Sequence, residues 1–93
     1  MPDKVELSKK AMKELRALPS YIATKLKSWV ELVEARGLLE ARKIPGYHDE
    51  PLKGERAGQR SIRLSKAYRA IYVVTKSGAF QIVFIETVNK HEY

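Results

Sequence analysis

The stretch QRSIRLSKAYRAIYVVTKSGAFQIVFIETV, residues 59–88, decides the fold, because its hydrophobic pattern has the period of a β-sheet. In RSIRLS, isoleucine and leucine alternate with serine and arginine, which is typical of a strand with one buried face. YRAIYVVT and AFQIVFIETV are rich in β-branched and aromatic residues, and KSG between them is a hairpin turn signal. The pattern predicts an antiparallel meander with strands at 59–65, 68–75 and 79–88.

The residues before this stretch have the spacing of two helices. Ser8 can cap a first helix that Pro19 stops, and Ser20 can cap a second helix that ends at Gly37. Apolar residues recur at helical spacing in both segments: Ala11, Leu15 and Leu18 in the first, and Tyr21, Ile22, Leu26, Trp29, Val30 and Val33 in the second. With a short opening strand at KVEL, the sequence predicts an α+β fold, in which an N-terminal helical hairpin packs on a twisted antiparallel β-sheet.

Residues 38–58 have no sustained period and contain three glycines and two prolines. We expect a long connecting loop there, with a helical turn at 38–43. Loops of this length in a compact protein often carry function. Few residues remain to cover the second face of the sheet, so that face is a candidate binding surface.

The length of 93 residues predicts one domain, spanning 1–93. The absence of cysteine excludes disulfides, thiol catalysis and Cys-type zinc sites. No apolar stretch approaches the ~18 residues of a membrane span, and the opening MPDKVELSKK lacks the apolar core of a signal peptide. We therefore expect a cytoplasmic protein that does not enter a membrane.

The chain is strongly basic, with a net charge of +7 and a sequence pI near 9.8. The excess is concentrated in one segment, which holds a single acid, Glu55, among six basic residues: Lys53, Arg56, Arg60, Arg63, Lys66 and Arg69. A basic stripe on a small protein favours a polyanionic partner, either a nucleic acid or an acidic protein. A solubilising surface is the alternative explanation.

Few residues of the chain could do chemistry, because the familiar catalytic and phosphate-binding motifs are absent. The two histidines, His48 and His91, lie in separate segments without the spacing of metal ligands, so we expect no metal and no other cofactor. Arg63 should point away from the core side of its strand. Arg69 stands on a strand otherwise destined for burial, where an arginine has either a task or an ion pair, here with Glu86.

The sequence given ends in KHEY, which places an imidazole, a carboxylate and a phenol together. If the last strand continues through them, His91 and Tyr93 share a side and Glu92 points to the other. Histidine beside arginines and an acid is suited to proton transfer at neutral pH. These groups fit RNA transesterification, which needs a base for the 2′-OH proton, cations for the phosphorane and an acid for the leaving oxygen, without a metal.

The order of strand, helical hairpin, DEPLKGERAGQRSIRLSKAYRAIYVV and terminal KHEY resembles the RelE/ParE superfamily of bacterial type II toxins. The resemblance covers essentially the whole chain and is nearest to the RelE-like branch that includes YoeB and HigB proteins. It implies a ribosome-dependent, metal-independent endonuclease that cuts mRNA in the A site by 2′-OH attack and thereby inhibits translation. It also implies a cognate antitoxin, whose complex with the toxin binds operator DNA.

The same resemblance implies roles for individual residues. Glu50 falls at the position of a catalytic glutamate, and Arg63 at that of a basic residue near the scissile phosphate. Arg69 matches the arginine that stabilises the transition state. His91 and Tyr93 match a terminal pair, one a candidate acid and the other a stacking or proton-donating group.

Further residues are expected to contact RNA or the ribosome: His48, Lys53, Arg56, Arg60, Lys66 and Lys90. Some HigB-like members have a catalytic histidine at the position of His48, and Glu92 separates a pair that is adjacent in YoeB-like chains. The general base therefore stays open among Glu50, His48 and Glu92. Two other functions stay open as well: a ParE-like inhibitor of DNA gyrase on the same fold, without nuclease activity, and a degenerate member that only binds an antitoxin.

Overall fold

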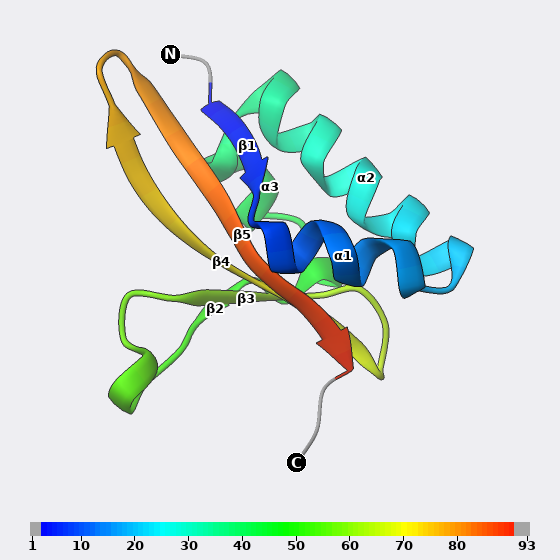
Figure 1. The fold of residues 1–93 in the computed structure, drawn as a ribbon. Helices are drawn as coiled ribbons and strands as arrows, with labels where there is room; N and C mark the ends of the chain where they lie inside the picture. Colours follow the sequence, from blue (N-terminus) through cyan, green and yellow to red (C-terminus); the bar gives the residue numbers. More distant parts are fainter. Residues whose placement is uncertain (1–2, 91–93) are drawn as a thin grey trace.

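The computed structural model describes residues 3–90, in which three α-helices lie against a twisted sheet (Figure 1). The order of elements is β1 (Asp3–Leu7), α1 (Lys9–Ala17), α2 (Ser20–Arg36), α3 (Leu38–Arg42), η1 (Pro45–Tyr47), β2 (Glu50–Pro51), η2 (Gly54–Arg56), β3 (Arg60–Arg63), β4 (Tyr68–Ser77) and β5 (Phe80–Lys90). No helix within this range is long and apolar enough to cross a membrane.

The strands lie in the order β1-β5-β4-β3-β2, which confirms the predicted meander of β3, β4 and β5. The sheet differs from the expected antiparallel one at its first strand, because β1 runs parallel to β5. β1 leads directly into α1, and the Ser8 N–H donates to the Ile85 carbonyl (2.9 Å), so the direction of β1 is set by where α1 must begin. The short KVEL pattern carries no information on direction.

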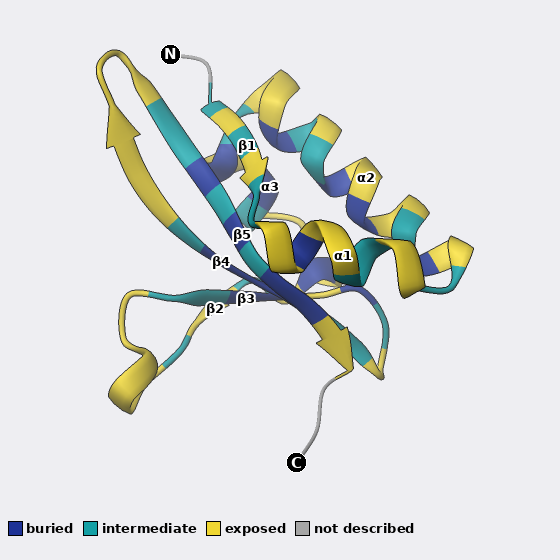
Figure 2. Cartoon of the chain, in the orientation of Figure 1, coloured by how far each residue is buried: buried dark blue, intermediate teal, exposed yellow. Residues whose placement is uncertain are grey.

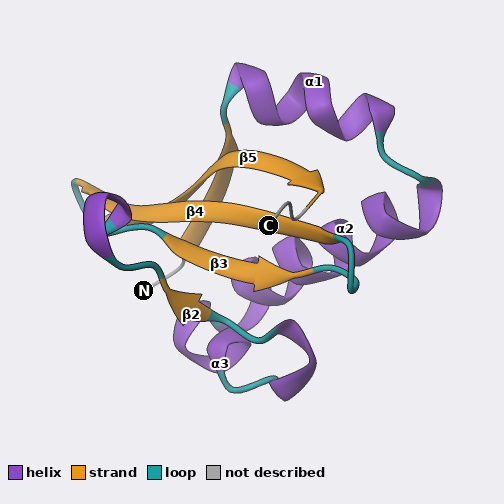
Figure 3. Ribbon diagram, turned by 90° about the horizontal axis from the view of Figure 1, so that it is seen from below, coloured by secondary structure: helices purple, strands orange, loops and turns teal. Residues whose placement is uncertain are grey.

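The helical hairpin covers one face of the sheet, as predicted (Figure 3). α1 begins at Ser8, whose hydroxyl accepts from the Ala11 N–H (2.9 Å). In α2 the buried side chains repeat at spacings of four, three and four: Ile22, Leu26, Trp29 and Val33. Tyr21, predicted as part of this stripe, is 66% exposed, and the cap of α2 is Pro19 rather than Ser20. Figure 2 shows the buried positions along the inner faces of both layers.

The hairpin between β4 and β5 is a two-residue turn at Gly78 and Ala79. Gly78 has φ +60°, the left-handed conformation that two-residue hairpin turns require. A bulge at Glu86 then interrupts the ladder, between the pairs Tyr72–Ile85 and Ile71–Thr87. The bulge matters for the site because its extra residue reverses the alternation: the side chains of β5 after Glu86 point to the opposite face from the one that an uninterrupted strand would give them.

The segment 38–58 is more ordered than the predicted loop. The helical turn expected at 38–43 is confirmed as α3, and Leu38 N–H donates to the Asp3 carboxylate (2.7 Å). β2 was not predicted; its two residues pair with β3, Glu50 opposite Ser61. A strand of two residues has no periodicity to detect.

α1 satisfies the edge of β5 beyond the point where its pairing with β1 ends, at Ile85. The Glu14 carboxylate accepts from the Val88 N–H (3.0 Å) and from the Thr87 hydroxyl (2.7 Å), and the Ser8 hydroxyl donates to the Glu86 carbonyl (2.7 Å). Val88 and Thr87 are buried. Because buried donors without acceptors are costly, this one carboxylate stabilises the strand that leads toward the end of the chain.

We therefore expect Glu14→Ala to lower the free energy of unfolding by about 1–3 kcal/mol, because it leaves two buried donors without an acceptor. Urea denaturation followed by circular dichroism would measure the change. Glu31→Ala is the matched control, since Glu31 is an exposed glutamate within α2. Equal stability of the two variants would contradict the role assigned to Glu14.

Candidate functional site

Strand alternation sorts the basic residues of β3 and β4 between the two faces of the sheet. Arg63 pairs with Arg69 and Ser61 pairs with Ile71, so these side chains share the face opposite the helices. Arg63 is exposed, as predicted from the burial of Ile62 beside it. The structure thus places the two arginines predicted to hold a phosphate side by side on the face that the helices leave uncovered.

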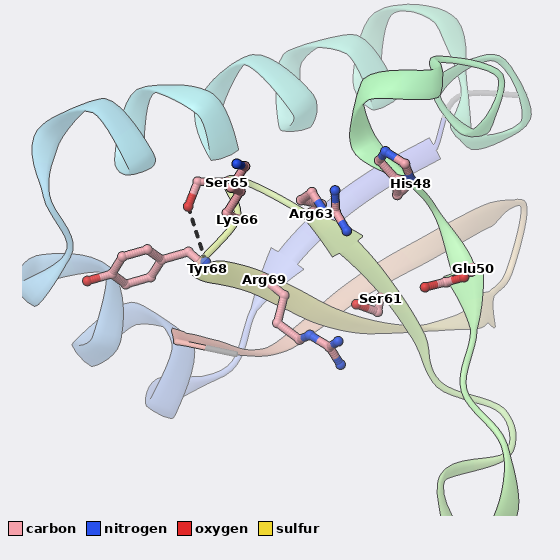
Figure 4. A pocket seen from close by; sticks show the side chains of 8 residues that line it. All are labelled: His48, Glu50, Ser61, Arg63, Ser65, Lys66, Tyr68 and Arg69. Atoms are coloured by element: carbon pink, nitrogen blue, oxygen red, sulfur yellow. Dashed lines mark hydrogen bonds between the residues drawn. The ribbon is translucent and has the colours of Figure 1, made fainter. Parts of the chain in front are cut away.

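A pocket lies on this open face (Figure 4). It is lined by His48, Glu50, Ser61, Arg63, Ser65, Lys66, Tyr68 and Arg69. Figure 4 shows the Arg63 guanidinium on the side of His48, whereas the Tyr68 ring points away from the arginines. The pocket therefore combines one carboxylate, one imidazole and three cationic side chains.

Two of these side chains come from the connecting segment rather than from the meander. His48 has φ 45° and ψ 50°, the one non-glycine residue with positive φ among residues 3–90. Glu50 opens β2 opposite Ser61. Both side chains belong to exposed residues. A left-handed non-glycine residue costs backbone energy, and such residues cluster at functional sites.

Between them, the side chain of Asp49 points the other way and is buried. Its side chain is 0% exposed; one oxygen accepts from Arg60 Nε (2.6 Å) and the other from the Tyr72 hydroxyl (2.5 Å). Arg60 and Tyr72 are directly opposite each other on β3 and β4. The Tyr72 ring in turn packs against Trp29 of α2, with centroids 5.3 Å apart.

This cluster changes the ionisation of its members. Burial, and then the hydrogen bond to Asp49, raise the pKa of Tyr72 to about 12, although Arg42 acts in the opposite direction. Burial lowers the pKa of Arg60, but the hydrogen bond and the charge of Asp49 outweigh it, so the net pKa of Arg60 is raised. Tyr72 is thus held as a neutral donor and Arg60 as a cation.

Arg60 was predicted to contact RNA, and the structure gives it a different environment. It stands three positions before Arg63, an odd number, so it faces the helix side of the sheet and pairs with Asp49. It does not line the pocket. The ion pair is a structural role that the basic stripe in the sequence did not reveal.

The remaining predicted residues are not all brought together. Lys66 lines the pocket, whereas Lys53 and Arg56 are exposed beside and within η2, outside its lining. Lys90 pairs with Tyr68 and so alternates onto the helix side of the sheet, away from Arg69. His91 and Tyr93, predicted as catalytic, lie outside the described residues, as does Glu92.

The alternative for Arg69, an ion pair with Glu86, stays a prediction. Arg69 stands opposite Asn89 on β5, and Glu86 occupies the bulge. One Glu86 oxygen accepts from Gln59 Nε2 (2.7 Å). The position of Arg69 at the pocket is therefore set by the β3–β4–β5 ladder.

Sequence reasoning missed several residues of the site. Ser61 is buried on the arginine face, and alternation with Ile62 could have found it. The Ser65 hydroxyl accepts from the backbone of Ala67 (3.1 Å) and Tyr68 (3.2 Å) and so shapes the turn from β3 to β4. Asp49 carried no local signal at all, because its partners are 11 and 23 residues away.

The arrangement can bind an anion and move a proton. The guanidinium groups of Arg63 and Arg69 suit the oxygens of a phosphate, and Glu50 or His48 can accept a proton from a hydroxyl held against them. Within residues 3–90, no group of three or more His, Cys, Asp or Glu side chains is placed to hold a metal ion. The pocket therefore offers acid–base and electrostatic chemistry on a phosphate ester.

The fold is similar to those of solved structures whose names include YoeB/ParE toxin, RelE and YafQ, which confirms the resemblance seen in the sequence at the level of fold. No protein-family model matches the chain, and no curated protein matches it in sequence. The likeness lies in the three-dimensional structure.

Particular solved structures make this concrete. A YoeB/ParE toxin from Agrobacterium tumefaciens is 21% identical, with a TM-score of 0.70 over 96% of this chain and 99% of that chain. YafQ from E. coli is 20% identical, with a TM-score of 0.74 over 96% and 93%. A chain of the archaeal RelE–RelB complex from Pyrococcus horikoshii is 22% identical, with a TM-score of 0.71 over 97% of this chain and 96% of that chain.

We expect Tyr72→Phe to destabilise the fold by about 1–3 kcal/mol at neutral pH, because it removes a donor from the buried Asp49. Because the pKa of Tyr72 is raised from 10.0 to about 12 in the folded protein, the neutral phenol stabilises the folded state fully below pH 10. This stabilisation is lost as the pH rises through 12. The difference in the free energy of unfolding between wild type and Tyr72→Phe should therefore decrease by roughly 1 kcal/mol by pH 11. Urea denaturation at pH 7, 9 and 11 would measure it; Tyr21→Phe, at an exposed tyrosine, is the control. A gap that does not change with pH would contradict the buried-phenol assignment.

Proposed function

We propose that the chain is the toxin of a type II toxin–antitoxin system and acts as a ribosome-dependent, metal-independent mRNA endonuclease in the cytoplasm. The observation that carries the proposal is the convergence of Glu50, His48, Arg63 and Arg69 on one pocket of the open sheet face. These are two candidate proton acceptors and two cations for a phosphate, contributed by three separate strands and a loop. The fold supports the same class, since its structural neighbours bear toxin names.

The reaction is a transesterification. Glu50 or His48 takes the proton of a 2′-OH, and the oxygen attacks the adjacent phosphorus. Arg63 and Arg69 offset the charge that develops on the phosphorane oxygens. The bond from phosphorus to the 5′-oxygen breaks, and that oxygen receives a proton. The products are a 2′,3′-cyclic phosphate and a 5′-hydroxyl; no water, metal or redox partner is consumed.

The proton for the leaving oxygen is assigned to the end of the chain. The proposal gives this role to His91 or Tyr93, because the sequence resembles the RelE-like branch at these positions. Ribosomal RNA and mRNA are the polyanions that the +7 charge would attract. Lys66 beside the pocket, and Lys53 and Arg56 near η2, are the cations proposed to contact them.

An antitoxin is the second proposed partner. The Pyrococcus neighbour was solved with RelB, and other neighbours as DinJ–YafQ and YoeB–YefM complexes. An acidic segment of such a protein would complement the open cationic face. Operator DNA would then be bound only through the toxin–antitoxin complex.

A ParE-like inhibitor of DNA gyrase is the alternative, because the name of the Agrobacterium neighbour includes ParE. On that alternative the pocket residues would serve binding rather than bond cleavage. The two functions differ in what they attack, so one pair of assays separates them.

We expect Arg69→Ala and Glu50→Gln each to reduce A-site cleavage at least about 100-fold, because each removes a group that acts on the reacting atoms. Primer extension on an mRNA after induction, and on ribosomes programmed in vitro, would measure the cuts. Arg16→Ala and Glu31→Gln are the matched controls, with the same change of charge at exposed helical positions. Wild-type cleavage by both pocket variants would contradict the site.

Gyrase supercoiling is assayed with the same four variants and the wild type. Intact supercoiling together with cleaved mRNA supports the nuclease. Inhibited supercoiling without any cut in mRNA would overturn it in favour of the gyrase alternative.

A further inference from the structure

We infer that Asp49 is a positioning residue for the pocket: its buried carboxylate ties the segment 48–50 to the sheet and thereby aims His48 and Glu50 at the phosphate-binding arginines. The inference deepens the proposed function and rests on it for the cleavage readout. Its geometric content, that Asp49 fixes its two neighbours, can be tested without any activity.

The attachment of Asp49 is complete and buried. Both carboxylate oxygens are engaged, one by Arg60 Nε (2.6 Å) and one by the Tyr72 hydroxyl (2.5 Å), and the side chain is 0% exposed. These two donors stand opposite each other on neighbouring strands. Hydrogen bonds to a charged group are stronger than neutral ones, so Asp49 is held at a point defined by two strands at once.

The segment 48–50 is also held from either side: Tyr47 before it is buried in the core, the His48 N–H donates to the Pro45 carbonyl (3.1 Å), and the Leu52 N–H donates to the Gln59 carbonyl (2.9 Å). β2 consists of Glu50 and Pro51 alone and lies at the edge of the sheet. His48 and Glu50 are exposed on either side of the buried Asp49. A two-residue edge strand is too short to be stable by its own ladder. The Asp49 anchor therefore adds a restraint, between those contacts, on where the side chains of His48 and Glu50 point.

The position of Asp49 determines where the side chains of Glu50 and His48 point. Glu50 follows Asp49 directly and opens β2, and successive residues of an extended backbone point to opposite sides, so an inward Asp49 directs Glu50 outward beside Ser61. His48 reaches the same pocket through its left-handed backbone. Releasing Asp49 would free the torsion angles on both sides of it, and displacements of about 1 Å can cost roughly 100-fold in rate.

The ion pair also protects the pocket electrostatically. A buried carboxylate so near the pocket would oppose phosphate binding if it were uncompensated. Arg60 neutralises it from the helix side, and the pocket keeps the cationic character set by Arg63, Arg69 and Lys66. Arg60 thus serves the site without facing it.

The cleavage test measures single-turnover rates on programmed ribosomes over a range of toxin concentrations. We expect Asp49→Asn to lower the maximal rate 10- to 100-fold while the half-saturating concentration changes less than about threefold. Glu40→Gln, which makes the same change in an exposed ion pair with Lys43 (2.7 Å), should cleave like wild type. In the Glu50→Gln background, Asp49→Asn should lower the rate by a smaller factor than it does in the wild type, because one of the two side chains that Asp49 positions has already lost its function. Full additivity of the two changes would overturn the inference.

The structural test uses NMR and needs no activity. Asp49→Asn should shift the His48 imidazole resonance and the amides of Glu50 and Ser61, and leave the distant turn at 78–79 unchanged; His48→Gln assigns the resonance. If Asp49→Asn does not fold, Tyr72→Phe keeps the ring on Trp29 and removes one of the two bonds, with smaller changes in the same direction. Unchanged signals at 48–50 would overturn the inference. If the signals at 48–50 shift but the wild-type protein cuts no mRNA, the positioning role of Asp49 would be supported and only the proposed nuclease function would be refuted.

Discussion

The contact between Trp29 and Tyr72 is the interaction on which both the core and the candidate site depend. Both side chains are fully buried, and their rings meet at 5.3 Å. The apolar body of Tyr72 holds α2 against β4, and its hydroxyl reaches Asp49 at the other end of the ring. An aromatic residue with a polar tip can serve both purposes at once. Through these two contacts, the Tyr72 side chain connects α2 to the segment that carries His48 and Glu50.

The second determining feature is that the helices cover only one face of the sheet. α1 and α2 pack on the face of Val83, Ile85 and Val88, and α1 also satisfies the edge of β5. The opposite face around β2, β3 and β4 carries the pocket. Because the core supports the strands from behind, arginines on the open side can stay exposed without loss of apolar burial. Rigid strands behind an open surface hold the side chains of a site in a fixed arrangement.

Local patterns predicted most of the fold and about half of the site. The Ser8 cap and the alternation around Ile62 are encoded within a few residues, and the structure confirms both. The KSG signal predicted the hairpin correctly, but Lys76 and Ser77 belong to β4 and the turn lies at Gly78 and Ala79. The direction of β1 and the existence of β2 depend on pairings between segments far apart in the chain. The anchoring role of Asp49 depends on such pairings too. No hydrophobic period reports them, so they could not be derived from the sequence alone.

The arginines of the basic stripe show why charge in a sequence is a poor map of charge in space. Arg60, Arg63 and Arg69 look alike as members of one +5 segment. Arg60 and Arg63 stand three positions apart on β3 and therefore face opposite sides of the sheet. Arg63 pairs with Arg69 of β4, so these two share a face. Arg60 neutralises the buried carboxylate of Asp49, whereas Arg63 and Arg69 lie together at the pocket. The local excess that could act on a phosphate is thus smaller than the stripe suggests, and it is more precisely placed.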